Sequence, residues 1–377
     1  MTALIIFALM AVSLALTLWC LRRSKPLAWE FAPVTESAPG RPEFDTLLDY
    51  ETRLGQAHSP SILTRADGFS VLWFEGSAEA QADIDLYEVS FARGPEGWRA
   101  SEPEPRVRRD AIGRAMEPGQ LVVTLGNTIE DEERDGGLFA TVVSVGGWAM
   151  ASVARVAMGA TGPRRAEKLS LSPMLNRSIL VKSPMVAYSD GSRALPAYFE
   201  MGQMHGLWVR FARDGRVSDV RRMDGPGLKP IQPMVVPLDG HRAVAFLRDF
   251  DVGRGRLLIS QTGDGGQSWS AVRETAMFNP SAPVAALPLG AGRILMAAND
   301  DPGAPDDLRL SISGDEGESW TVHHRFAGEG AALRYPMLRR LEDGRIALSY
   351  SHGTKRGVRV HVMTLSWIEA QSEGRGT

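Results

Sequence analysis

Residues 262–269 read TGDGGQSW and residues 313–320 read SGDEGESW, so the two octapeptides share the pattern S/T-x-D-x-G-x-S-W. Their aspartates, Asp264 and Asp315, lie 51 residues apart. In such a turn the aspartate side chain accepts hydrogen bonds from backbone N–H groups, the glycine takes a left-handed conformation, and the tryptophan packs between strands. We call this turn the Asp box. Its recurrence predicts a repeated β-sheet unit of about 50 residues.

A second repeat runs in phase with the Asp box. A glycine turn, usually Asp-Gly, recurs six times at spacings of 49 to 68 residues, and an apolar run follows it each time. Asp-Gly between apolar runs is a strong hairpin signal, because glycine accepts a positive φ at no steric cost. Six units predict an all-β, six-bladed β-propeller with Asp-box turns. The hairpin turns are Asp67-Gly68, Asp135-Gly136, Asp190-Gly191, Asp239-Gly240, Gly290–Gly292 and Asp343-Gly344, and degenerate Asp boxes are expected at residues 90–98, 160–168 and 213–217.

The strand order within a blade predicts which face carries a site. If the inner strand runs to the Asp-Gly turn and the Asp box joins the third strand to the fourth, both kinds of turn lie on one face. The starts of the inner strands and the ends of the second strands then surround the central channel on the opposite face. Loops on a rigid scaffold are where binding residues gather, so we expect the site there.

The side chains expected around this channel are polar, charged or aromatic. A propeller mouth can be polar only because it is hydrated, but this set also suits a sugar, which needs hydrogen bonds to hydroxyl groups and an aromatic platform. The inner strands contribute His58, Asn127, Lys182, Gln232, Asn279, Arg334 and Tyr335, and the second strands contribute Glu75, Glu79, Trp148, Tyr198, Glu200, Arg248, Asp249, Asn299, Asp300 and His352.

The N-terminal segment is the other distinct region. Ala3–Leu21 is apolar and uncharged, and 19 helical residues span roughly 28 Å, close to the ~30 Å hydrocarbon core of a bilayer. We therefore predict a transmembrane anchor at residues 1–23, a linker with an entry strand or helix at 24–53, the propeller at 54–369 and a flexible tail at 370–377. The expected location is the bacterial inner membrane with a periplasmic propeller, although Arg22, Arg23 and Lys25 after the helix favour the opposite orientation.

Composition narrows the classes of partner. The net charge is −3, and no basic stripe suggests a nucleic-acid partner. The one cysteine, Cys20, lies in the apolar segment, so no disulfide can form within the chain. No P-loop, GxSxG elbow or Cys/His cluster occurs, and we expect neither a cofactor nor a metal.

Several stretches resemble the sialidase superfamily, in particular divergent bacterial Asp-box (BNR) repeat proteins. The resemblance covers His58–Trp367 and implies a sialidase-like propeller that acts on carbohydrate. It is carried by HSPSI and ADGFSVLWFEGS, by LGNTI and SVGGWA, by LVKSPMVAYSDGSRALPAYFE, and by IQPMVVPLDG, FNPSAPVAAL and YPMLRRLEDGRIALSYS.

The resemblance also implies roles for single residues. Sialidases attack with a tyrosine activated by a glutamate, and Tyr335 matches that tyrosine while Gln232 stands where the glutamate would be. Of the three arginines that hold the substrate carboxylate, Arg248 matches one, and His58 occupies the position of another. Asp83 is the nearest match to the acid/base aspartate. Because glutamine cannot act as a base and Pro305 stands at the third arginine position, we do not expect the standard sialidase mechanism.

Two hypotheses for function follow. The first is a glycoside hydrolase or polysaccharide lyase acting on an acidic or non-sialic glycan. In it Tyr335 and His58 react, Glu200 or Asp83 assists, and the substrate is bound by Arg248, Lys182, Gln232, Asn127, Asn279, Asn299, Trp148 and Arg334. The second is a non-catalytic carbohydrate-binding or envelope polysaccharide-assembly propeller at the membrane. A protein-binding scaffold would place apolar residues on the channel face, and the predicted ring is polar.

Overall fold

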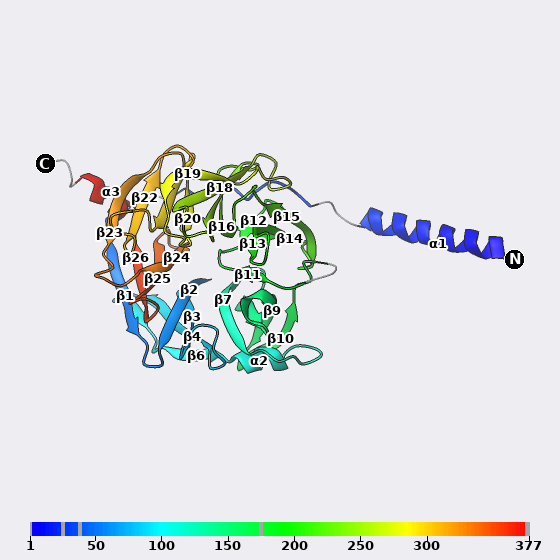
Figure 1. Cartoon of the computed structure of the whole chain (residues 1–377), viewed down its shortest axis with the longest axis horizontal. Helices are drawn as coiled ribbons and strands as arrows, with labels where there is room; N and C mark the ends of the chain where they lie inside the picture. Colours follow the sequence, from blue (N-terminus) through cyan, green and yellow to red (C-terminus); the bar gives the residue numbers. More distant parts are fainter. Residues whose placement is uncertain (1, 24–26, 37–39, 173–175, 374–377) are drawn as a thin grey trace.

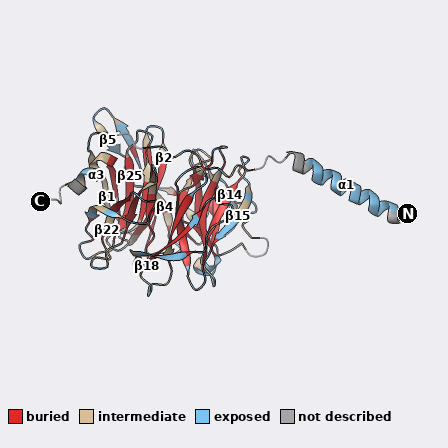
Figure 2. Ribbon diagram, turned by 90° about the horizontal axis from the view of Figure 1, so that it is seen from above, coloured by how far each residue is buried: buried red, intermediate tan, exposed pale blue. Residues whose placement is uncertain are grey.

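The computed structural model describes residues 2–23, 27–36, 40–172 and 176–373, and Figure 1 shows them as a β-propeller from which helix α1 (Thr2–Arg23) extends away. Six antiparallel sheets are arranged in a ring. The predicted all-β, six-bladed architecture is confirmed. Apolar side chains are buried within and between the sheets, so the strands are largely buried while α1 is exposed (Figure 2).

Each blade is built from strands that follow one another along the chain. Blade 1 contains β2 (Gln56–Arg65), β3 (Gly68–Gly76), β4 (Asp85–Gly94) and β5 (Gly97–Ala100), with β6 (Glu104–Val107) beside β4. Helix α2 (Arg109–Arg114) leads to blade 2, which contains β7 (Thr124–Asp131), β8 (Gly137–Val143), the 3-10 helix η1 (Gly147–Met150), β9 (Ser152–Gly159) and β10 (Gly162–Lys168).

In blade 3 the inner strand is divided into two short pieces. These are β11 (Ile179–Val181) and β12 (Val186–Ala187), and both pair with β13 (Arg193–Phe199), which is followed by β14 (His205–Phe211) and β15 (Val217–Met223). Blade 4 contains β16 (Pro230–Pro237), β17 (Ala243–Asp249), β18 (Arg256–Thr262) and β19 (Arg273–Phe278). Blade 5 contains β20 (Ala285–Gly290), β21 (Arg293–Ala298), β22 (Leu308–Ser313) and β23 (Thr321–Phe326).

Blade 6 closes the ring with strands from both ends of the chain. It contains β24 (Arg334–Arg340), β25 (Ile346–His352) and β26 (Gly357–Met363), and its outer strand is β1 (Phe44–Glu51). Buried Glu75 of blade 1 accepts hydrogen bonds from Tyr50 Oη (2.8 Å), from Thr52 Oγ1 and from Trp73 Nε1 (2.7 Å). Glu75 was expected at the channel, but it instead ties the closing strand to blade 1.

The glycine turns and the Asp boxes lie between the strands that the sequence predicts. All six glycine turns join an inner strand to a second strand, and the Asp boxes join third strands to fourth strands. In the second Asp box, Asp315 Oδ1 accepts hydrogen bonds from the backbone N–H of Ser319 (2.8 Å) and from Ser313 Oγ (2.8 Å). Hydrogen bonding, led by the Ser319 hydroxyl, lowers the pKa of Asp315 to about 2. Gly266 has a φ of +91°, and a Cβ there would lie 2.6 Å from Trp208 Nε1.

Within the predicted linker, residues 28–32 lie against the face that carries the Asp-Gly turns, and we call this segment the strap. The Phe31 N–H donates to the Gly240 carbonyl (2.7 Å), and Phe31 is buried. The Arg210 guanidinium lies 3.2 Å from the Tyr188 ring centroid and 5.0 Å from that of Trp29. The strap therefore joins blades 3 and 4 before β1 closes blade 6.

The two ends of the chain differ in part from the prediction. Helix α3 (Leu365–Glu373) continues into the predicted tail, whose residues 374–377 lie outside the described residues. No helix in the described part of the chain is long and apolar enough to span a membrane. The transmembrane prediction for residues 1–23 is therefore not supported.

Candidate functional site

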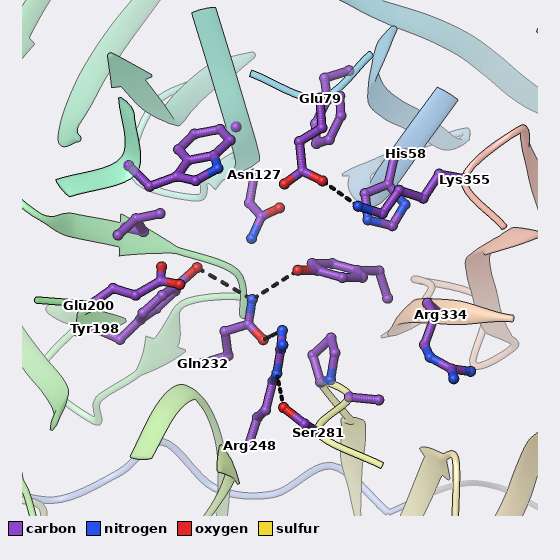
Figure 3. Close-up of a pocket in the computed structure, with 17 residues that line it drawn as sticks. His58, Glu79, Asn127, Tyr198, Glu200, Gln232, Arg248, Ser281, Arg334 and Lys355 are labelled. Atoms are coloured by element: carbon purple, nitrogen blue, oxygen red, sulfur yellow. Dashed lines mark hydrogen bonds and ion pairs between the residues drawn. The ribbon is translucent and has the colours of Figure 1, made fainter. Parts of the chain in front are cut away.

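A cavity of about 290 Å³ opens on the channel face that the strand order predicts. All six blades line it, and Figure 3 shows their side chains converging on one space. The lining residues include His58 and Glu79 from blade 1, Asn127 and Trp148 from blade 2, Tyr198 and Glu200 from blade 3, Gln232 and Arg248 from blade 4, Ser281 from blade 5, and Arg334, Tyr335 and Lys355 from blade 6.

Bulges in the inner strands direct side chains towards this cavity. Ser59, Gln232 and Tyr335 have φ values of 58°, 52° and 57°, and each precedes a proline. The strand register shifts at the same three places. A bulge inserts one extra residue and redirects side chains, and a left-handed non-glycine residue costs on the order of 1–3 kcal/mol. Strain repeated at equivalent positions around one cavity makes this cavity the candidate functional site.

A chain of hydrogen bonds links Arg248 to Tyr335. Arg248 Nη1 donates to Gln232 Oε1 (3.3 Å), and Gln232 Nε2 donates to the hydroxyl oxygens of Tyr335 (3.4 Å) and Tyr198 (3.3 Å). Because arginine can only donate, it fixes the orientation of the Gln232 amide. Ser281 Oγ accepts a further bond from Arg248 Nε (3.0 Å). Gln232 therefore presents an N–H, not a base, to the Tyr335 oxygen.

His58 stands against Tyr335 but is shielded. Their ring centroids are 4.4 Å apart, and the ring of Phe74 packs on the other side of His58 at 5.5 Å. Each His58 nitrogen exposes less than 1 Å² and has no hydrogen-bond partner in the described structure. Burial, with the charges of Lys355 and Arg248, holds the pKa of His58 well below its ordinary value, so the ring is neutral. His58 lines the cavity, but both of its nitrogens are buried in this conformation, so Tyr335 is the member of the predicted reacting pair whose polar atom is accessible.

The two carboxylates and the three cations that line the cavity have distinct environments. Burial raises the pKa of Glu200, Arg248 opposes that shift, and the charge of Glu79 adds to it. Glu79 itself pairs with Lys355, with Nζ and Oε2 2.5 Å apart. Arg334 pairs with Asp306 (2.8 Å). Among the described residues, no carboxylate lies within ion-pair distance of Arg248.

The structure brings together eight of the twelve predicted site residues. Those lining the cavity are His58, Asn127, Trp148, Glu200, Gln232, Arg248, Arg334 and Tyr335. Gly126 makes room for Trp148, because a Cβ at residue 126 would lie 2.9 Å from the indole ring. Trp148 can thus serve as the predicted aromatic platform.

The other four predicted site residues do not line the cavity. Asp83 accepts hydrogen bonds from the N–H and hydroxyl of Ser77 (both 3.0 Å) and so shapes a loop. Buried Lys182 donates from Nζ to the Pro336 carbonyl (2.5 Å), and burial lowers its pKa to about 7. Asn279 caps the backbone of Ala282, and Asn299 donates to the carbonyls of Asp307 and Leu333. These four side chains hold neighbouring loops and strands in place and do not face the cavity.

Four polar residues that line the cavity had no predicted role in the site. Glu79 and Tyr198 were expected on this face, whereas Ser281 and Lys355 were not considered. The available signal for Lys355 was its place in the loop that follows the last second strand. The part of the chain that the structure describes contains no group of three or more His, Cys, Asp or Glu side chains that could hold a metal ion.

The sequence matches the family model of the BNR repeat-like domain over residues 67–348. No curated protein sequence matches this chain. Among solved structures, a protein of unknown function from Dyadobacter fermentans is 14% identical with a TM-score of 0.62, and the match covers 85% of this chain and 99% of that one.

Two sialidases have similar folds. The Hadza microbial sialidase Hz136 is 14% identical with a TM-score of 0.61, over 82% of this chain and 66% of that one. Trypanosoma rangeli sialidase in complex with the inhibitor DANA is 10% identical with a TM-score of 0.60, over 91% of this chain and 60% of that one. This chain thus spans less than two thirds of either sialidase, and at these identities the likeness shows the fold alone.

Proposed function

The chain belongs to the family of BNR repeat-like domains, and from this premise we propose that its propeller cleaves an acidic or non-sialic glycan with Tyr335 as the reacting group. The family match agrees with the sequence resemblance to the sialidase superfamily. The proposal concerns the activity and the substrate.

One observation carries the proposal: an arginine without an ion-pair partner is connected through Gln232 to a strained, accessible tyrosine. Arg248 supplies the charge that an anionic sugar requires, since no carboxylate in the described residues lies within ion-pair distance of it. The Gln232 N–H stabilises the negative charge that remains on the Tyr335 oxygen when the phenol proton passes to a water molecule in the open cavity. A cavity of about 290 Å³ is at the lower limit for small-molecule sites and suits a single sugar residue at a chain end.

Glu200 is the best-placed proton donor. Its raised pKa keeps the carboxyl group protonated at higher pH than an exposed glutamate, which is what a general acid for the leaving oxygen needs. This role replaces the one considered for Asp83, which the loop of Ser77 already uses. His58 supports the Tyr335 ring rather than touching the sugar.

A second candidate function is carbohydrate binding without cleavage. It is favoured by Gln232, because a neutral amide cannot remove the proton of Tyr335 as a carboxylate could. The same pocket would then hold a glycan end on Trp148 and Arg248 and leave it intact.

A depolymerisation screen separates the two candidates. The chain of residues 1–377 would be incubated with polygalacturonate, alginate, hyaluronan and a sialyl-lactose reporter. Reducing ends and unsaturated uronates released from each substrate would be measured. We expect cleavage of at least one acidic substrate and at least a 100-fold loss of turnover in Tyr335→Phe. Tyr87→Phe, the same change on β4 outside the cavity, is the control. Binding of an acidic polymer without release of product would leave the binding function.

The location of the propeller is a separate proposal. We propose that α1 attaches the protein to the bacterial inner membrane and that the propeller is periplasmic, because the apolar side chains between Leu4 and Trp19 are exposed on this helix. Fractionation should place the full chain with membranes, and protease added to spheroplasts should digest the propeller. Protection of the propeller would instead put it on the cytoplasmic side.

A further inference from the structure

The ion pair between Glu79 and Lys355 crosses the mouth of the cavity where blades 1 and 6 meet. Glu79 lies on the loop between β3 and β4, and Lys355 lies on the loop between β25 and β26. Figure 3 shows their charged ends together at one side of the cavity, with His58 next to Lys355. Both residues line the cavity.

The loops do not depend on this ion pair for their shape. The Lys355 carbonyl accepts a hydrogen bond from the Ala57 N–H (2.9 Å), and the Glu79 N–H donates to Gln56 Oε1 (2.7 Å). The side chains of Glu79 and Lys355 are 30% and 39% exposed, and ion pairs with this exposure add little to stability. Stabilisation of the two loops therefore does not explain why Glu79 and Lys355 form an ion pair.

The backbone that presents the pair is strained. Thr354 and Lys355 have φ values of 53° and 74°, and Ala80, beside Glu79, has a φ of 65°. Glycine or asparagine would adopt these conformations at lower cost. Of these three residues Lys355 lines the cavity, and strain kept at such a residue is an argument that its side chain is used.

The cations that line the cavity differ in whether a carboxylate neutralises them. Lys355 is neutralised by Glu79 and Arg334 by Asp306. Of the cations lining the cavity within the described residues, this leaves Arg248 for an anionic group. An ammonium donates up to three hydrogen bonds and a carboxylate accepts several, so a neutral pair of the two complements neighbouring hydroxyl groups, which both donate and accept.

We propose that Glu79 and Lys355 form a subsite for two adjacent hydroxyl groups of a pyranose whose single anionic group is bound by Arg248. This inference rests on the proposed function, because it specifies the sugar that the same cavity takes. It names the substrate class as a sugar with one negative charge and a free diol on the side of blades 1 and 6. A sulfate ester on that diol is excluded, because it would meet the Glu79 carboxylate.

Ligand-observed NMR titration tests the subsite with sugars of known charge. The probes are D-glucuronate, D-galacturonate and D-mannuronate, with D-glucose, D-galactose and D-mannose as their neutral partners. Arg248→Met should weaken binding of the acids alone, until each uronate binds like its neutral partner. Glu79→Gln and Lys355→Met should each weaken the neutral sugars by about 5- to 10-fold. Because each variant leaves its partner's charge unpaired, the acids should lose less than the neutral sugars in Glu79→Gln and more in Lys355→Met.

The double variant and a control complete the experiment. Because one diol contacts both side chains, Glu79→Gln combined with Lys355→Met should cost no more than about the larger single effect. Arg216→Met removes an exposed, ion-paired arginine that does not line the cavity, and it should leave the binding of all sugars unchanged. If Arg248→Met acts as expected and the two pair variants bind normally, the subsite is wrong and the proposed function stands. If no acid binds the unmodified protein, both fail.

Discussion

Replacement of Glu75 by glutamine should loosen the closure of the propeller. The carboxylate accepts three hydrogen bonds in a site that is 1% exposed, and they come from Tyr50, Thr52 and Trp73. Glutamine keeps the shape of the side chain, and its oxygen can still serve Tyr50 and Thr52. Its amide nitrogen, however, then faces the Trp73 Nε1–H, so two donors meet in the core.

The size of the effect follows from these contacts. A hydrogen bond to a charged group contributes about 1.5–3 kcal/mol, and a buried donor left without a partner costs about 1–3 kcal/mol. We expect Glu75→Gln to lower the free energy of unfolding by about 3 kcal/mol. With about 2 cal/mol/K of unfolding entropy per residue, a propeller of this length loses roughly 1–2 °C in Tm per kcal/mol, or about 5 °C.

Scanning calorimetry and urea unfolding measure this loss. Glu96→Gln is the matched control, because it is the same change in the same blade at a side chain that is 84% exposed. Tyr50→Phe removes one of the three donors without creating a donor clash and should cost about 1 kcal/mol. A Tm of Glu75→Gln within 1 °C of the unmodified protein would show that these hydrogen bonds do not hold the ring closed.

Three further predictions concern pH and the pocket. Glu200→Gln should abolish the decline of turnover with rising pH, because the proton donor that ionises through its raised pKa is gone; an unchanged pH profile would rule Glu200 out. Burial lowers the pKa of His361 to about 3, so the unfolded chain binds the extra proton and stability should fall by about 1.4 kcal/mol per pH unit as pH drops from 6.5 towards 3. Urea unfolding of His361→Phe should lack that part of the slope, and an equal slope would contradict the assignment. Gly126→Ala should displace Trp148 and weaken sugar binding at least as much as Trp148→Ala in the NMR titration, whereas normal binding would show that the indole is not the platform.

The fold was accessible from the sequence because its signals are local. An Asp-Gly turn or an Asp box depends on the residues within it, as the bonds from Ser313 and Ser319 to Asp315 show. Repetition of such turns at one period then specifies the blades and their faces. The outer strand β1 was not assigned to a blade, because it lies in the predicted linker and entry segment, far along the chain from the other strands of blade 6.

The site was accessible only in part because it depends on contacts between blades. Strand position placed Gln232 and Tyr335 at the channel, but it could not separate them from Asn279 or Asn299, whose side chains turn back to cap nearby backbone. Lys182 illustrates the same limit, because its partner Pro336 lies 154 residues away. No local pattern distinguishes a lysine that faces a cavity from one that supports its wall.

Gln232 shows why the chemistry cannot be inferred from residue type alone. Taken singly, a neutral amide in place of a carboxylate suggests a loss of function, because it cannot accept the Tyr335 proton. In the structure its oxygen is occupied by Arg248, so its nitrogen must point to the phenol and stabilise negative charge there. The substitution also leaves Arg248 without a carboxylate partner among the described residues, and this arginine is consequently available for a substrate anion. The amide that cannot act as a base thus leaves Arg248 available for an anion, which is what the proposed acidic sugar requires.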